Sequence, residues 1–250
     1  MVSHDSYVSR KPRLLRSFDR SVARLKPMLV ARYGEDEARI LVRGARQEYE
    51  QLIPYIPYIG DWTPMLIFLL PTTRYLATYL ALQKHGGPVE EAGQLIYAMC
   101  EADGEAIPVL ARRVAQELWF SRWFRRRVQR RAATSQERQY PGGYLLTYVE
   151  GDGVQFDYGV DYIECACCKM LEAQGAEELG PYVCAVDQVA GELFGWGLRR
   201  TTTLAEGGVR CDFRFKKGGR TEVAVPVVLG EVGGEPRAGR KRNSETQGGV

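Results

Sequence analysis

The sequence contains little histidine, no long apolar segment and no marked excess of either charge. Only two of its 250 residues are histidine, His4 and His85. The formal net charge of +3 is too small to indicate a nucleic-acid partner by itself. The longest strongly apolar run, Met65–Leu70, covers about a third of the length that crosses a bilayer. We therefore expect neither a nucleic-acid nor a membrane partner.

A cysteine framework of the kind found in small secreted proteins is also missing. The six cysteines lack regular spacing, and Met1–Pro12 carries charges but no apolar core of a secretory signal. We therefore expect free thiols and a cytoplasmic location. Hydrophobic residues make up 45% of the chain and charged residues 26%, as in an ordinary globular protein that can bury a sizeable core.

Residues 1–131 are predicted to form a helical region. Apolar residues recur at helical spacing from Leu14 onwards, and Gly34 is expected to separate two helices. Residues 111–131 interleave eight arginines with four aromatic residues. We interpret this segment as a helix with its aromatic face in the core or at a subunit contact, so it is the expected surface of a possible homo-oligomer. The alternative is a helix that binds nucleic acid or an anionic surface.

Residues 141–229 have a different pattern and are predicted to form an α+β catalytic region. Asp161 is expected to cap a helix, with Glu164 three residues later in the position of a capping-box carboxylate. A second helix is expected from Pro181 to about Gly195. The segments expected as strands are Tyr144–Val149, Val154–Tyr158, Arg199–Thr203, Val209–Phe215 and Val223–Leu229. The tail, residues 230–250, is rich in glycine and charge and is expected to be disordered.

Five of the six cysteines lie between residues 158 and 215. Cys165 and Cys168 have the C-x-x-C spacing of zinc ligands, and Cys184 with Cys211 would be the second pair that a structural zinc site needs. No histidine is near them in the sequence. The alternative is that several of these cysteines, Cys167 and Cys168 above all, are small buried apolar residues. We expect no metal and no cofactor.

Two carboxylates lie close to these cysteines. Cys184 and Asp187 share one face of the predicted helix, on a stripe that is otherwise apolar. A partly buried Asp either pairs with a cation or keeps its proton, and both states suit acid–base catalysis. The alternative is an Asp bound to a backbone amide or to an arginine. Glu164 is either a capping residue or a second group that transfers protons.

The segment Arg199–Thr203 places two guanidinium groups beside three hydroxyls. On a strand, Arg200 and Thr202 share one face, and one inward arginine would bind a carboxylate. The alternative is a solvated edge strand. Cys211 lies just beyond the Gly207–Gly208 turn, and it is a plausible nucleophile if a cation lowers its pKa.

Three motifs at these residues resemble the L-2-amino-thiazoline-4-carboxylic acid hydrolase family. They are FDYGVDYIEC (Phe156–Cys165), PYVCAVDQVAGELFG (Pro181–Gly195) and RTTTLAEGGVRCDFRFKKG (Arg200–Gly218). Residues 56–60 and the helices after them are also similar, through more generic motifs. The crowded run from Cys165 to Cys168 departs from the family by its additional thiols.

The resemblance implies that the protein opens a thiazoline ring. Water adds to the C=N carbon of a carboxylate-bearing substrate, the C–S bond breaks and an N-carbamoyl cysteine forms. The expected catalytic residues are Cys211 or Cys165 as nucleophile, with Asp187 or Glu164 transferring protons. Arg200 is expected to hold the carboxylate. Alternatively, a carboxylate activates water directly and the cysteines only shape the pocket. The further residues expected to bind substrate are Thr201, Thr203 and Cys184.

The expected fold is α+β, with a helical N-terminal layer packed on a small antiparallel β-sheet with two helices. The closing strand, glycine turn and Cys-x-Phe pattern also resembles 4-vinyl reductase-like ligand-binding domains. Fold alone does not fix function. Two other functions are therefore kept as alternatives: a biosynthetic enzyme acting on another imine, amidine or lactam, and a non-catalytic module that binds a small molecule or zinc.

Overall fold

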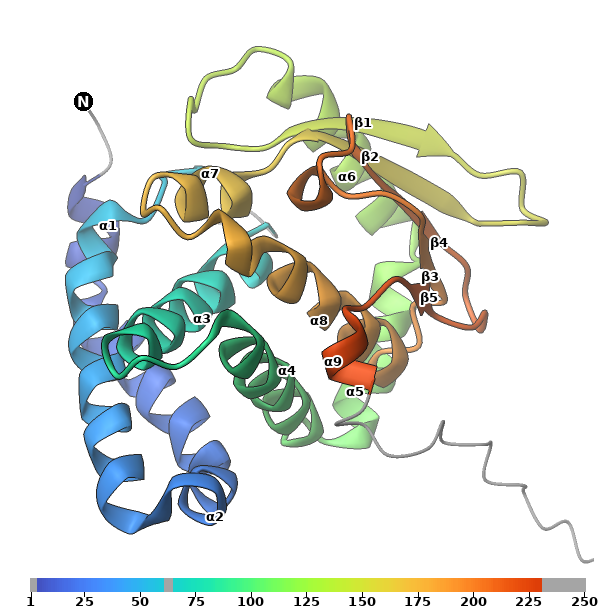
Figure 1. The fold of residues 1–250 in the computed structure, drawn as a ribbon. Coiled ribbons are helices and arrows are strands. Elements are labelled where there is room, and N and C mark those ends of the chain that lie inside the picture. Colours follow the sequence, from blue (N-terminus) through green and yellow to red (C-terminus); the bar gives the residue numbers. More distant parts are fainter. Residues whose placement is uncertain (1–3, 61–64, 231–250) are drawn as a thin grey trace, which may run out of the picture.

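A computed structural model describes residues 4–60 and 65–230, which form an α+β fold with a helical N-terminal half and a small sheet (Figure 1). The expected disordered tail lies almost entirely outside these residues. The short helix α1 (His4–Val8) precedes α2 (Lys11–Leu52), which is interrupted at Gly34. Gly34 has φ +80° and ψ 167°, a combination that glycine adopts at little cost. The prediction that Gly34 separates two helices is therefore confirmed, and Figure 1 shows the two halves of α2 side by side.

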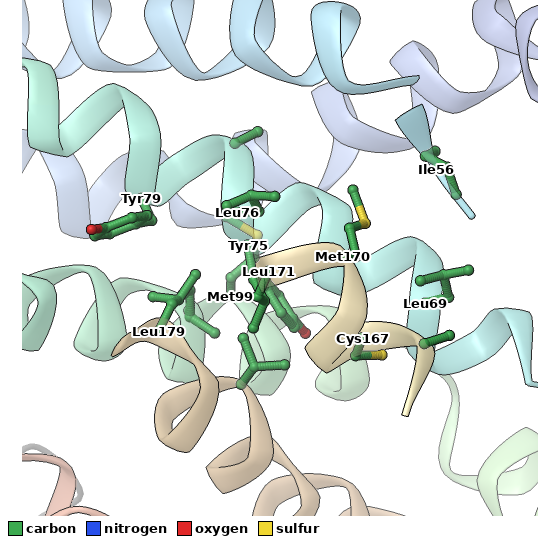
Figure 2. Packing of buried hydrophobic residues seen from close by; sticks show 14 of the residues in the cluster. Ile56, Leu69, Tyr75, Leu76, Tyr79, Met99, Cys167, Met170, Leu171 and Leu179 are labelled. Atoms are coloured by element: carbon green, nitrogen blue, oxygen red, sulfur yellow. The ribbon is translucent and has the colours of Figure 1, made fainter. Parts of the chain in front are cut away.

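The helical half is held together by a continuous apolar core. Helices α3 (Leu66–Lys84) and α4 (Val89–Glu105) pack against α2, and the ring of Phe18 stacks on that of Tyr49 at 5.0 Å. Figure 2 shows Leu76 of α3 and Met99 of α4 meeting Leu171 and Leu179 from the second half of the chain. The helical layer and the α+β region thus share one core. No helix within the described residues has both the length and the hydropathy needed to cross a bilayer.

The arginine-rich segment forms two helices and not one. Helix α5 (Val109–Trp119) ends at Phe120, and α6 (Arg122–Ser135) begins after Ser121. The Ser121 hydroxyl accepts a hydrogen bond from the backbone N–H of Phe124 at 3.1 Å, which is the usual cap of a helix start. The prediction of one continuous helix over 111–131 is therefore wrong. The chain starts a new helix at the Ser121 cap, although the arginine and aromatic pattern continues through it.

The sheet has five strands in the order β1-β2-β4-β3-β5. Neighbouring strands are antiparallel except β3 and β5, which are parallel, so the expected antiparallel sheet is in fact mixed. The strands are β1 (Leu145–Glu150), β2 (Tyr158–Glu164), β3 (Leu198–Arg200), β4 (Cys211–Phe215) and β5 (Glu222–Val223).

Three local predictions in the second half are wrong. Residues 154–157 form a loop, because Asp152 accepts hydrogen bonds from the backbone N–H groups of residues 154 to 156. Asp161 caps no helix: it lies in the middle of β2, where it pairs with Arg214 at 2.7 Å. Glu164 ends the same strand and is not part of a capping box.

The end of the described chain also differs from the prediction. The expected strand Val223–Leu229 stops at Val223, and the helix α9 (Val227–Gly230) follows Pro226. Proline has no N–H to donate to a strand ladder, which explains why β5 is short.

Two further helices cross between the helical layer and the sheet. Helix α7 (Ala166–Glu172) begins directly after Cys165. Helix α8 (Gly180–Leu193) matches the predicted helix from Pro181 and packs on α4. Short 3-10 turns occur at Ile53–Tyr55, Glu177–Leu179 and Leu204–Glu206. Because α8 lies between the two layers, one of its faces lines the space that they enclose.

Candidate functional site

A cavity of about 470 Å³ lies between α3, α4, α5, α7, α8 and the sheet. Its walls are mainly apolar, and they include side chains from both halves of the chain. Five of the six cysteines line it: Cys100, Cys165, Cys167, Cys184 and Cys211. The sixth, Cys168, is not among the lining residues. The sequence showed that the cysteines are concentrated in one segment, and in the fold most of them line this one cavity.

A buried ion pair lies in the wall of this cavity. The guanidinium group of Arg200, on β3, pairs with the carboxylate of Asp187, on α8. Arg200 also donates to the backbone carbonyl oxygen of Cys184 at 3.1 Å, and its guanidinium carbon lies 5.5 Å from the centre of the Phe213 ring. Arg200 is 4% exposed whereas the neighbouring Arg199 is exposed, because successive strand residues point to opposite faces. One arginine therefore points inward as expected, and its partner is Asp187, the arginine-bound state that was the alternative for this residue; binding of a substrate carboxylate by Arg200 stays a prediction.

Asp187 is poised to exchange a proton near neutral pH. Burial raises the pKa of its carboxyl to about 6, although the charge of Arg200 opposes the rise. A carboxylate with such a pKa is mostly ionised at pH 7 and can still take up a proton transiently. Buried groups with pKa values shifted towards neutrality are typical of catalytic sites.

Cys211 starts β4 and is 4% exposed. Burial raises the pKa of its thiol, so the neutral form dominates at pH 7. Two groups oppose this shift: the backbone N–H of Leu204, which donates to the sulfur at 3.2 Å, and the charge of Arg200. Within the described residues no hydrogen-bond donor is recorded for the Cys184 sulfur, and burial raises its pKa strongly against the charge of Arg200. Among these thiols, Cys211 therefore has both a hydrogen-bond donor and a cation to stabilise a developing thiolate.

Cys165 and Cys167 belong to a different part of the wall. The hydroxyl of Tyr144 and the sulfur of Cys167 share a hydrogen bond of 3.1 Å, and Thr72 donates to the same sulfur at 3.3 Å. The pKa of Cys167 is raised well above its usual value by its hydrogen bond with Cys165 and by burial. The pKa of Cys165 is also raised, because the side chain of Cys168 and burial outweigh the opposing bond to Cys167. These thiols are neutral and fixed by their neighbours.

Three predicted site residues lie away from the cavity. Glu164 pairs with Arg138 and Lys169, and the hydrogen bond from Lys169 is the main cause of its lowered pKa. Thr201 donates to Asp212 at 2.6 Å. The side chain of Thr203 accepts from the backbone N–H of residue 206 and so caps a 3-10 turn. None of the three is a cavity-lining residue. Their observed contacts hold loops and strand ends in place.

Sequence reasoning missed the polar residues that the helical half contributes. Arg74 of α3 and Asp103 of α4 both line the cavity and lie 3.5 Å apart. Arg74 also donates to Ser17 at 3.0 Å, while its buried Nε has no hydrogen-bond partner among the described residues. The available signal was a single charged residue, Arg74, in the otherwise uncharged stretch from Leu66 to Leu82. Both residues lie far in sequence from the cysteine-rich segment 158–215, so nothing in the sequence grouped them with it.

The zinc alternative finds no support in the geometry. Within residues 4–60 and 65–230, no group of three or more His, Cys, Asp or Glu side chains is arranged to hold a metal ion. Cys168 does not face the cavity that Cys184 and Cys211 line. The tetrahedral set that a structural zinc site requires is therefore not assembled from these cysteines.

The model of one protein family matches residues 70–215, which is more than half of the chain and spans α3 to β4. The family is described as L-2-amino-thiazoline-4-carboxylic acid hydrolase. The chain belongs to this family. The matched range contains Asp187, Arg200 and Cys211, and it also contains Arg74 and Asp103. The family expected from the sequence motifs is therefore confirmed.

No curated protein and no solved structure gives a match to this member of the hydrolase family. The expected likeness to 4-vinyl reductase-like domains thus stays a prediction.

Proposed function

We propose that this hydrolase-family member opens a cyclic amidine of the thiazoline type in a small carboxylate-bearing heterocycle similar to L-2-amino-thiazoline-4-carboxylate. One observation carries the proposal: Cys211 and the buried Asp187–Arg200 pair line one cavity. Ring opening needs a group that adds to the C=N carbon, a group that moves protons and a cation for the carboxylate. This cluster offers one residue for each task.

Arg200 is the proposed ligand of the substrate carboxylate. Its hydrogen bonds to Asp187 and Cys184 both leave from Nη1. A guanidinium group has five N–H donors, so further donors exist for a second carboxylate. Asp187 stays mostly ionised at pH 7, so it can accept the thiol proton and later return that proton to the leaving group.

In the proposed reaction, Cys211 adds to the ring carbon between sulfur and nitrogen. Because the thiolate is scarce at pH 7, the thiol proton passes to Asp187 as the new C–S bond forms. The ring C–S bond then breaks, and Asp187 returns the proton to the departing sulfur. Water adds to the resulting isothiourea carbon and expels the Cys211 thiol, with Asp187 again moving the proton. The product is an N-carbamoyl cysteine.

The direct route forms no bond to Cys211 and no isothiourea: water adds to the ring carbon, the ring C–S bond breaks, and Asp187 returns the proton to the departing sulfur. Asp187 would remove a proton from water, which attacks the same carbon, and Cys211 would only shape the wall. We favour the covalent route because the Leu204 N–H and the Arg200 charge both stabilise negative charge on the Cys211 sulfur. Cys165 and Glu164 are less suited, since the pKa of Cys165 is raised well above its usual value and Glu164 lies outside the cavity.

The test is incubation of the protein with L-2-amino-thiazoline-4-carboxylate, followed by mass spectrometry of the small molecules and of the intact chain. We expect the ring-opened carbamoyl product and, on rapid quenching, an adduct on Cys211. Cys211→Ala should abolish turnover, whereas the matched control Cys168→Ala should retain it.

Three results separate the alternatives. Full turnover by Cys211→Ala would reject the covalent route and leave the direct one. Turnover of other cyclic amidines but not of this compound would reject the thiazoline substrate. A raised melting temperature without any turnover would reject catalysis and indicate a binding module.

A further inference from the structure

The cavity extends well beyond the cluster of Asp187, Arg200 and Cys211. Lining residues recur along α8 from Cys184 through Asp187 and Ala190 to Phe194. At a rise of about 1.5 Å per residue, the ten steps from Cys184 to Phe194 correspond to about 15 Å. The volume of about 470 Å³ also lies in the range of pockets that hold drug-sized ligands. A single five-membered ring with an amino group and a carboxylate fills only one end of this space.

The other end of the cavity is aromatic. The ring of Trp196 stacks on Trp119 at 4.4 Å, with 13° between the planes, and on Phe194 at 5.4 Å. Trp196 lies in the turn before β3, Trp119 ends α5, and Phe194 directly follows α8. All three residues line the cavity. Flat rings fixed against one another by stacking form a rigid apolar surface that suits another flat group.

Two hydrogen-bond donors in this aromatic end lack an acceptor. The indole Nε1 atoms of Trp119 and Trp196 are buried, and neither has a hydrogen-bond partner in the part of the chain that the structure describes. Buried indole N–H groups usually find an acceptor, since leaving one unpaired costs free energy. Trp196 is 7% exposed as a whole residue. A ligand oxygen would satisfy such a donor once a small shift of the indole ring turns its N–H towards the cavity.

We infer that the aromatic end is a second substrate subsite. The substrate is then a cyclic amidine or thiazoline that carries an aromatic or other flat apolar extension with a hydrogen-bond acceptor. This inference rests on the proposed function, because it places the reacting ring beside Asp187 and Cys211. The extension passes Ala190, which lies one turn along α8 from Asp187 and presents only a methyl group.

The test compares three compounds: L-2-amino-thiazoline-4-carboxylate, its 2-phenylamino derivative and its 2-(4-acetylphenyl)amino derivative. For the unmodified protein, kcat/KM should rise by about tenfold or more from the parent compound to the acetylphenyl compound. Ala190→Phe should remove this preference, because the new ring fills the passage between the two ends. The readout is the kcat/KM of each extended compound divided by the kcat/KM of the parent compound. A general loss of activity lowers all three values and leaves these two ratios unchanged.

A second variant tests the unpaired donors. Trp196→Phe keeps an aromatic ring but removes one indole N–H, so it should reduce the advantage of the acetylphenyl compound over the phenyl compound. The matched control is Trp123→Phe, because Trp123 is 64% exposed and does not line the cavity. The control should leave both ratios unchanged.

The outcomes distinguish the subsite from the reaction. Turnover of the parent compound with no preference for the extended ones overturns the subsite and leaves the proposed function intact. Binding of the acetylphenyl compound without turnover, measured by melting temperature and abolished by Ala190→Phe, supports the subsite and overturns the reaction. An Ala190→Phe variant with the same ratio as the unmodified protein overturns the subsite, and absence of both binding and turnover overturns both.

Discussion

Replacing Arg200 by methionine should destabilise the protein in a way that depends on pH. The side chains of Arg200 and Asp187 are 2% and 12% exposed, so the variant leaves a carboxylate buried without its cation. Breaking a buried ion pair by removing one partner typically costs about 3–5 kcal/mol. For a chain of this size, each kcal/mol lowers the melting temperature by roughly 2–4 °C, so the expected loss is about 6–20 °C.

The direction of the pH effect follows from the pKa of Asp187. This pKa is about 6 in the folded protein, above the 3.8 of an ordinary Asp carboxyl. The stability that Asp187 contributes is therefore fully present below the unfolded value and is lost as pH rises through about 6. Without Arg200 the folded-state pKa rises further, since the arginine charge favours the ionised form. The variant should thus lose more stability at pH 8 than at pH 5, where Asp187 is protonated in both proteins.

The assay is denaturant unfolding of both proteins at pH 5 and pH 8. Arg199→Met is the matched control, because Arg199 is the exposed neighbour on the same strand, and it should change stability by less than about 0.5 kcal/mol. The double variant Arg200→Met with Asp187→Asn should recover part of the loss at pH 8. Equal losses for Arg200→Met at both pH values would refute the assignment of a charged, paired Asp187.

The remaining predictions concern catalysis and packing. Asp187→Asn should lower kcat/KM by about 100- to 10,000-fold. For the unmodified protein we expect kcat/KM to fall below about pH 6 as this carboxylate protonates, and the variant should lose that limb; an unchanged pH profile would exclude Asp187 as the base. Gly93→Ala should destabilise the fold by about 1–3 kcal/mol, because its Cβ would lie 2.1 Å from the Tyr182 ring. Gly44→Ala is the paired control: its Cβ would meet Ala81 at an ordinary 3.6 Å, so thermal unfolding should show a gain of about 0.5–1 kcal/mol.

The position of the site between the layers has a consequence for the helical half of the chain. Arg74 and Asp103 reach the cavity from α3 and α4, and Trp119 reaches it from α5. Residues on both sides of the predicted boundary between 131 and 141 therefore line the same cavity. The α+β region supplies the proposed reacting groups Asp187, Arg200 and Cys211, and the helical region lines the rest of the cavity.

The sequence by itself determined the class of fold and several of its elements. Periodicity predicted the helical first half, the break at Gly34 and the helix α8, because these depend on local spacing and on glycine. The motifs around Cys165, Asp187 and Cys211 also indicated the family. The predicted start of α7 and the predicted ends of several strands were wrong, because individual side-chain hydrogen bonds and ion pairs set the observed ends. Asp152 accepts backbone hydrogen bonds that fix residues 154–157 as a loop. Asp161 pairs with Arg214 of the neighbouring strand and so lies in β2 and not at a helix start.

Only the tertiary structure decided which of these residues form a site. Glu164 and Cys165 are adjacent in sequence, yet Cys165 lines the cavity and Glu164 does not, because Glu164 pairs with Arg138 and Lys169. The pKa of Asp187 depends on burial between two layers and on an arginine thirteen residues away, neither of which is a local property. Local patterns fix the elements, whereas burial, charge pairing and cavity shape arise from the packing of distant segments.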